Sequence, residues 1–90
     1  MENDFLESLC TVEVKKRTQY YKDENLLKHI GSRIREERIK KDISQESLAN
    51  ECEVDYSQVN RMELGKVNFS ISYLFRIASA LHVDPKQLLP

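Results

Sequence analysis

The stretch SQESLANECEVDYSQVNRMELG, residues 44–65, predicts two short helices joined by a tight turn. Ser44 can cap the first helix with its hydroxyl, and Asp55 can cap the second with its carboxylate. Apolar residues recur at helical spacing behind each cap. In the first helix these are Leu48, Ala49 and Cys52, and in the second they are Val59 and Met62. The segment therefore indicates a compact helical pair.

The side of the second helix opposite Val59 and Met62 carries mostly hydrogen-bonding residues. On a helical wheel of about 100° per residue, this outward arc contains Tyr56, Ser57, Asn60, Arg61 and Leu64. Such side chains have the chemistry needed to read base edges in the major groove of DNA. An ordinary polar surface gives the same pattern, and it is the better interpretation of this helix taken alone, because any exposed helix has such a side.

The ordered set of residues around this pair resembles the helix-turn-helix of the lambda-repressor-like (Xre/Cro) family. The matching positions are Ser44-Gln45-Glu46-x-Leu48-Ala49, then Val54, Val59 and Met62, then Glu63 and Gly65, then Ile77-Ala78-x-x-Leu81. The resemblance extends over roughly residues 27–89, about two thirds of the chain. It implies an all-α, five-helix DNA-binding domain whose second short helix lies in the major groove of double-stranded DNA.

The resemblance and the outward arc together suggest site residues. We expect Tyr56, Ser57, Asn60 and Arg61 to contact bases, with Arg61 able to reach O6 and N7 of a guanine. We expect phosphate contacts from Gln45, Lys66 and Asn68, and from the free N–H groups at the start of the first short helix.

A longer helix is predicted ahead of the pair, from Asn25 or Leu26 to about Lys40. Its apolar stripe continues onto Arg38, where a charge is costly unless it is paired. The resemblance implies that Arg38 forms an internal ion pair with Glu63. The alternative is a solvated arginine.

Three residues depart from the family pattern. Asp42 and Glu53 stand where glycine is usual, and Leu64 stands where a polar residue is usual. Asp can adopt the left-handed conformation, whereas Glu53 is expected to carry strain of order 1 kcal/mol. We expect the fold to tolerate all three.

Two further helices are expected after Gly65. Ser70 caps the first, and its apolar residues are expected to form a buried face: Ile71, Leu74, Phe75, Ala78 and Leu81. Asp84 and Pro85 begin a short last helix. Leu88 and Leu89 on that helix would either close the core or, with the end of the preceding helix, form a homodimer seam.

Residues 1–24 form a predicted N-terminal extension, and residues 25–90 the helix-turn-helix domain. Asp4 and Glu7 suggest a capping box for a short helix, and the stretch TVEVKKRT alternates like a strand. This extension is interpreted either as a dimerisation or partner-binding arm or as a loosely attached terminus.

The composition of the 90-residue sequence is that of an ordinary globular domain, with 40% hydrophobic and 32% charged residues. There is no room for a second catalytic domain, and neither a membrane span nor a signal peptide is evident. The expected location is cytoplasmic. The net charge of −1 argues mildly against nucleic acid, although residues 28–90 carry ten bases and nine acids.

No catalytic constellation, metal site or cofactor site is predicted. Cys10 and Cys52 lack the spacing of a zinc site, and Cys52 is expected to be a buried thiol rather than a nucleophile.

The favoured function is a sequence-specific transcriptional regulator that binds an inverted repeat as a homodimer and is not an enzyme. Alternatives are an antitoxin with a toxin partner, a restriction-modification controller, and a protein-binding module that does not read DNA.

Overall fold

The computed structural model describes residues 21–90, which fold into four α-helices and one short 3-10 helix with no strand among them. The elements are α2 (Glu24–Lys40), α3 (Gln45–Cys52), α4 (Tyr56–Glu63), α5 (Ile71–Leu81) and η1 (Pro85–Leu88). The all-α prediction is confirmed for this part of the chain. The prediction of five α-helices is wrong, because the last element is a 3-10 helix of only four residues. The helix and strand suggested for residues 1–20 lie outside the described residues.

Side chains cap most of the helices where the sequence predicted. The side-chain oxygens of Ser44 and Ser70 accept hydrogen bonds from N–H groups in the first turns of α3 and α5. Asp23 caps α2 in the same way, so this helix begins at Glu24, slightly earlier than expected. Asp55 occupies the N-cap position of α4 but makes no side-chain capping bond, so that predicted cap is wrong.

Among residues 21–90, three residues other than glycine adopt the left-handed conformation, each at the end of a helix or in a turn. Asp42 has φ 57° and Glu53 has φ 59°, as expected for the positions where the family pattern has glycine. His82, which the sequence did not single out, ends α5 with φ 60°. At Glu53 and His82 the backbone N–H bonds back to the last turn of the helix, which satisfies carbonyls that the helix leaves free.

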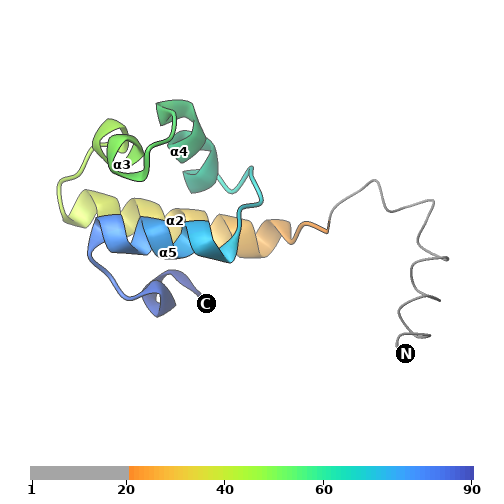
Figure 1. The fold of residues 1–90 in the computed structure, drawn as a ribbon. Coiled ribbons are helices and arrows are strands. Elements are labelled where there is room, and N and C mark those ends of the chain that lie inside the picture. The colour runs from red at the N-terminus through yellow and green to blue at the C-terminus, as the bar shows by residue number, and fades with distance from the viewer. Residues whose placement is uncertain (1–20) are drawn as a thin grey trace, which may run out of the picture.

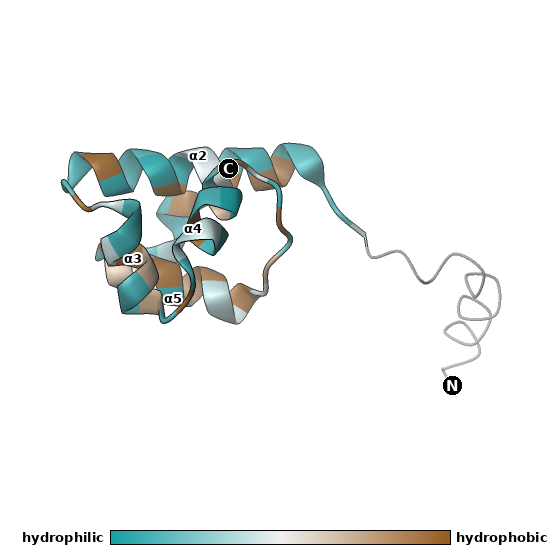
Figure 2. Cartoon of the chain, turned by 90° about the horizontal axis from the view of Figure 1, so that it is seen from above, coloured by the Kyte–Doolittle hydropathy of each residue, from teal (hydrophilic) through white to brown (hydrophobic). Residues whose placement is uncertain are grey.

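The core lies between the two long helices and the helix-turn-helix pair. In Figure 1, α3 and α4 lie on one side of α2 and α5, and η1 lies on the other side. Packing contacts join α3 to α4 and α5, α4 to α2, and η1 to both long helices. Figure 2 shows hydrophobic and hydrophilic residues alternating along α2, as expected for a helix with one buried side. The central core residues are Ile34, Leu48, Val59, Met62, Ile77, Leu81 and Leu88.

The predicted buried face of α5 is only partly correct. Leu74, Ala78 and Leu81 are buried, but Ile71 is 69% exposed and Phe75 is 55% exposed. Phe75 lies about 100° around the helix from Leu74, so it falls outside the arc that faces the core. Ile77, on the other flank of that arc, is fully buried. Exposed apolar residues are therefore left on one flank of α5.

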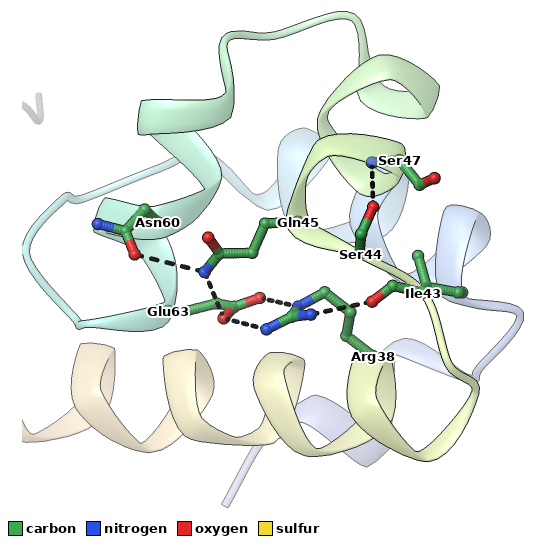
Figure 3. Close-up of polar contacts among 7 residues, drawn as sticks. All are labelled: Arg38, Ile43, Ser44, Gln45, Ser47, Asn60 and Glu63. Atoms are coloured by element: carbon green, nitrogen blue, oxygen red, sulfur yellow. Dashed lines mark hydrogen bonds and ion pairs between the residues drawn. The ribbon is translucent and has the colours of Figure 1, made fainter.

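An ion pair and its hydrogen bonds join α2, α3 and α4 (Figure 3). Arg38 donates from Nε to Oε2 of Glu63 at 2.6 Å and from Nη2 to Oε1 at 3.1 Å. Its Nη1 donates to the carbonyl oxygen of Ile43 at 2.9 Å. The side chains of Arg38 and Glu63 are 11% and 1% exposed. A two-point, charge-assisted contact of this kind fixes the end of α4 against α2.

Gly31 allows α2 and α4 to approach closely. This residue is buried in the middle of α2, where glycine is otherwise unfavourable. A Cβ atom at this position would lie 2.6 Å from the carbonyl oxygen of Glu63 and closer still to that of Met62. The backbone at the end of α4 therefore rests directly on α2.

Gly31→Ala should lower the free energy of unfolding by about 1–3 kcal/mol, because the new methyl group overlaps the α4 backbone. This loss should appear although alanine is the better helix former by about 1 kcal/mol. Ser32→Ala, at the exposed neighbouring position, should change stability by no more than about 0.5 kcal/mol. Urea titration measures both, and an unchanged or raised midpoint for Gly31→Ala would contradict the close approach.

Glu63→Ala should lower the free energy of unfolding by about 3–5 kcal/mol, because it leaves the Arg38 charge buried and unpaired. Glu36→Ala is the matched control, since Glu36 faces Arg33 at 3.9 Å in an exposed pair. That substitution should cost about 0–1 kcal/mol. Equal losses in the two variants would mean that the buried pair has no special role.

Candidate nucleic-acid interface

The exposed side of α4 carries the residues predicted to contact bases. Tyr56, Ser57 and Arg61 are exposed, and Asn60 is half-buried. On the opposite side Val59 and Met62 are fully buried. Arg61 donates from Nη2 to Oε1 of Gln58 at 2.8 Å and has no ion pair within residues 21–90. Its positive charge is therefore available to a ligand on this surface.

Gln45 has an internal role that the sequence did not indicate. Its Nε2 donates to Oε1 of Glu63 at 2.9 Å and to Oδ1 of Asn60 at 3.3 Å (Figure 3). The amide nitrogen expected to meet a phosphate is thus directed at α4. The family pattern identifies Gln45 as a matched position, but its contacts depend on how α3 and α4 are packed. Gln45 is a positioning residue that ties the start of α3 to the outward side of α4.

This contact also determines which end of Asn60 is free. Because Oδ1 of Asn60 accepts from Gln45, the Nδ2 group of the same amide is the end without a hydrogen bond among the described residues. An amide nitrogen is a donor only. Asn60 therefore presents a hydrogen-bond donor on this surface.

The loop after α4 holds the two other predicted phosphate residues. Lys66 and Asn68 are both exposed. Nδ2 of Asn68 donates to the carbonyl oxygen of Tyr21 at 2.9 Å, and Nζ of Lys22 donates to the carbonyl oxygen of Lys66 at 3.1 Å. The segment before α2 thus lies against this loop, a contact that the sequence did not predict.

Positive side chains gather near the loop although the described domain is neutral. Residues 21–90 contain eleven acidic and eleven basic residues. Gly65, with φ 74°, packs against the backbone of Lys28, since a Cβ there would lie 2.7 Å from the Lys28 Cα atom. The start of α2 at Lys28 and the loop at Lys66 therefore lie close together, and the Lys22 ammonium group reaches the carbonyl oxygen of the same loop. A neutral protein can bind an anion when its bases share a face in this way.

Among the described residues neither a reactive thiol nor a metal-ligating cluster is found. Burial raises the pKa of the Cys52 thiol, outweighing the lowering effect of Arg76, so this sulfur stays protonated and packs in the core. Residues 21–90 contain no cluster of three or more metal-ligating side chains. None of their helices has the length and hydrophobicity needed to cross a membrane.

Comparison with known proteins identifies relatives over most of this domain. The helix-turn-helix family model HTH_3 matches residues 34–88. The control protein C.BamHI of Bacillus amyloliquefaciens is 38% identical over 60 residues, which cover 66% of this chain and 74% of that protein. A second relative is an uncharacterized transcriptional regulator in the ATPase CF(0) region of Rhodospirillum rubrum. It is 38% identical over 55 residues, covering 61% of this chain and 51% of the relative.

Solved structures with the same fold include further relatives. The restriction-modification controller protein C.AhdI from Aeromonas hydrophila is 38% identical, with a TM-score of 0.67 over 70% of this chain and 96% of that chain. The hypothetical transcription factor NHTF from Neisseria is 33% identical, with a TM-score of 0.69 over 80% and 84% of the two chains. The fold alone also recurs in part of an enzyme, hydroxypropylphosphonic acid epoxidase from S. wedmorenis, at 19% identity. On the match of the family model and of these relatives, the chain belongs to the HTH_3 family of helix-turn-helix proteins.

Proposed function

We propose that this protein is a sequence-specific DNA-binding transcriptional regulator of the cytoplasm. The observation that carries the proposal is the exposed polar side of α4, held rigidly by the buried Arg38–Glu63 pair in a helix-turn-helix pair of the HTH_3 family. A helix fixed in this way can enter the major groove as a rigid body. The names of the relatives support the same function. Two are control proteins at 38% identity, and one is a hypothetical transcription factor at 33% identity.

The base-reading residues are Tyr56, Ser57, Asn60 and Arg61. The Arg61 guanidinium pairs with O6 and N7 of a guanine. Asn60 donates from Nδ2, because its oxygen is engaged by Gln45, so it favours an acceptor such as guanine O6 or N7 or thymine O4. Bidentate recognition of adenine would require that oxygen as well.

Phosphate contacts come from the start of α3 and from the loop after α4. The N–H groups at a helix N-terminus present unpaired donors and a positive dipole to an anion. Because Nε2 of Gln45 is directed at Glu63 and Asn60, the backbone at the start of α3 carries this contact, and Gln45 assists with its position only. Lys66 and Asn68 hold the next phosphate.

Binding is proposed to be by a homodimer on an inverted repeat, with the two α4 helices about 34 Å apart, one turn of duplex. Of the two leucines expected at a dimer seam, Leu88 is fully buried within the chain and so is unsuited to it, whereas Leu89 is 40% exposed. The seam is better placed on Ile71 and Phe75, which lie one turn apart on α5 and are both exposed. A two-fold axis at this side of α5 would pack Ile71 and Phe75 of one protomer against the same residues of its partner, as a symmetric dimer requires.

A restriction-modification controller is the specific regulator that the relatives favour. Both C.BamHI and C.AhdI carry controller names, and each is 38% identical to this chain. The neighbouring genes test this role, since a restriction-modification controller is expected to lie beside the genes of a restriction-modification system. A toxin partner has no comparable support.

Arg61→Ala should relax preference at one base position in each half-site, because it removes a contact worth about 1–3 kcal/mol of discrimination. Binding selection with the variant and with the natural chain measures this preference position by position. Lys86→Ala is the control, since η1 lies on the far side of α2 and α5 from α4 (Figure 1). Uniform weakening on every sequence would make Arg61 a phosphate contact.

Phe75→Glu should convert the proposed dimer into a monomer at a protein concentration on the order of tens of micromolar, because it places a charge in the apolar seam. The same variant should bind its operator more weakly. Sedimentation equilibrium measures the change in mass. Ile39→Glu is the matched control, because Ile39 is also 55% exposed but lies at the end of α2, beside the end of α5 rather than its beginning. A natural chain that stays monomeric, or an Ile39→Glu variant that dissociates equally, would contradict the α5 seam.

A further inference from the structure

The side chain of Arg61 on α4 is held by a neutral group. Its Nη2 donates to Oε1 of Gln58 at 2.8 Å. Three other arginines within residues 21–90 are paired with carboxylates instead: Arg33 with Glu36, Arg38 with Glu63, and Arg76 with Glu53. A carboxylate both holds an arginine and neutralises it, whereas an amide oxygen holds it and leaves its charge intact. Arg61 is therefore oriented without losing its positive charge.

Two carboxylates lie beside Gln58, yet neither pairs with Arg61. Gln58 lines a shallow hollow next to the start of α4 together with Glu53 and Asp55. Glu53 is paired with Arg76 at 3.3 Å, and among the described residues no ion pair joins Arg61 to either acid. The partner of Arg61 is thus the neutral side chain of this region.

The position of Gln58 on α4 suits it to hold Arg61 rather than to contact a base. It precedes Arg61 by three residues, so it lies about 60° around the helix, on the flank next to the buried Met62. Gln58 is half-buried, whereas Arg61 is exposed. Because an arginine can only donate, the amide oxygen must be the end of Gln58 that faces it. Gln58 therefore presents an acceptor from the side of the helix and not from the centre of its exposed face.

We propose that Gln58 is a positioning residue that orients the Arg61 guanidinium toward a guanine in the major groove. This inference rests on the proposed function and adds to it a residue that determines specificity without touching DNA. Arg61 keeps its other N–H groups for O6 and N7 of the guanine.

The physical basis is the conformational freedom of the arginine. A free arginine side chain loses rotamer freedom when it binds a base, and one already held by a hydrogen bond loses less. This cost arises only where the base contact forms. Gln58 therefore strengthens binding to the guanine-containing site alone, which raises discrimination at that base pair.

The experiment measures the affinity of the full chain for a selected operator and for a duplex in which one base pair is changed. That base pair is the one whose preference Arg61→Ala relaxes. Gln58→Leu removes the acceptor and should lower the ratio of the two affinities by about two- to tenfold. It should cause no further loss in the Arg61→Ala background, and preferences at other base pairs should stay as they are.

Gln58→Glu is the matched control, because it keeps an acceptor oxygen and adds a negative charge. It should retain most of the discrimination that Gln58→Leu loses, while its affinity falls alike on both duplexes. A purely structural role would not separate the two variants in this way. Thermal melting of both should stay close to that of the natural chain, since the bond to Arg61 is exposed.

Unchanged discrimination in Gln58→Leu would overturn the positioning role, and the relaxed preference of Arg61→Ala would leave the proposed function intact. An equal loss from Gln58→Leu in the natural and Arg61→Ala backgrounds would also overturn it, because Gln58 would then contact a base itself. Uniform weakening by Arg61→Ala would remove the guanine contact that this role requires. A natural chain without any sequence preference would overturn the proposed function and this inference together.

Discussion

The buried pair between Arg38 and Glu63 is the interaction on which the arrangement of the helices depends. One carboxylate accepts two hydrogen bonds from the arginine and a third from Gln45, so α2, α3 and α4 meet at a single group. The arginine also donates to the carbonyl oxygen of Ile43, just before α3 begins. Burial makes these contacts mutually dependent, because removing any charge strands its partner away from water. These contacts hold α4 in one orientation against α2 and α3.

Gly31 adds a steric constraint to this electrostatic one. The backbone at the end of α4 rests on α2 where a side chain would collide, and the ion pair lies two turns further along α2. Together they determine both the distance and the rotation of α4 relative to the long helix. A recognition surface made of a few side chains requires such support, since an error of about 1 Å in position is enough to lose a directional contact.

Much of this fold could be predicted from spacing and caps, because short helices with clear N-caps and apolar repeats are local features. Ser44, Ser70 and Asp84 cap as expected, and Val59 and Met62 are buried. The exposure of Ile71 and Phe75 could not be read in this way, since a helical repeat does not reveal how wide the buried arc is. The bond between Gln45 and Asn60 and the contact of Tyr21 with Asn68 join distant parts of the chain, so only the packed structure could reveal them.

The central claim, that α4 reads DNA sequence, is tested most directly by selecting binding sites for the intact chain from random duplex DNA. The proposed homodimer predicts an enriched inverted repeat whose half-sites are centred about one helical turn, roughly 34 Å, apart. The claim would be contradicted if the folded chain enriched no sequence from the library.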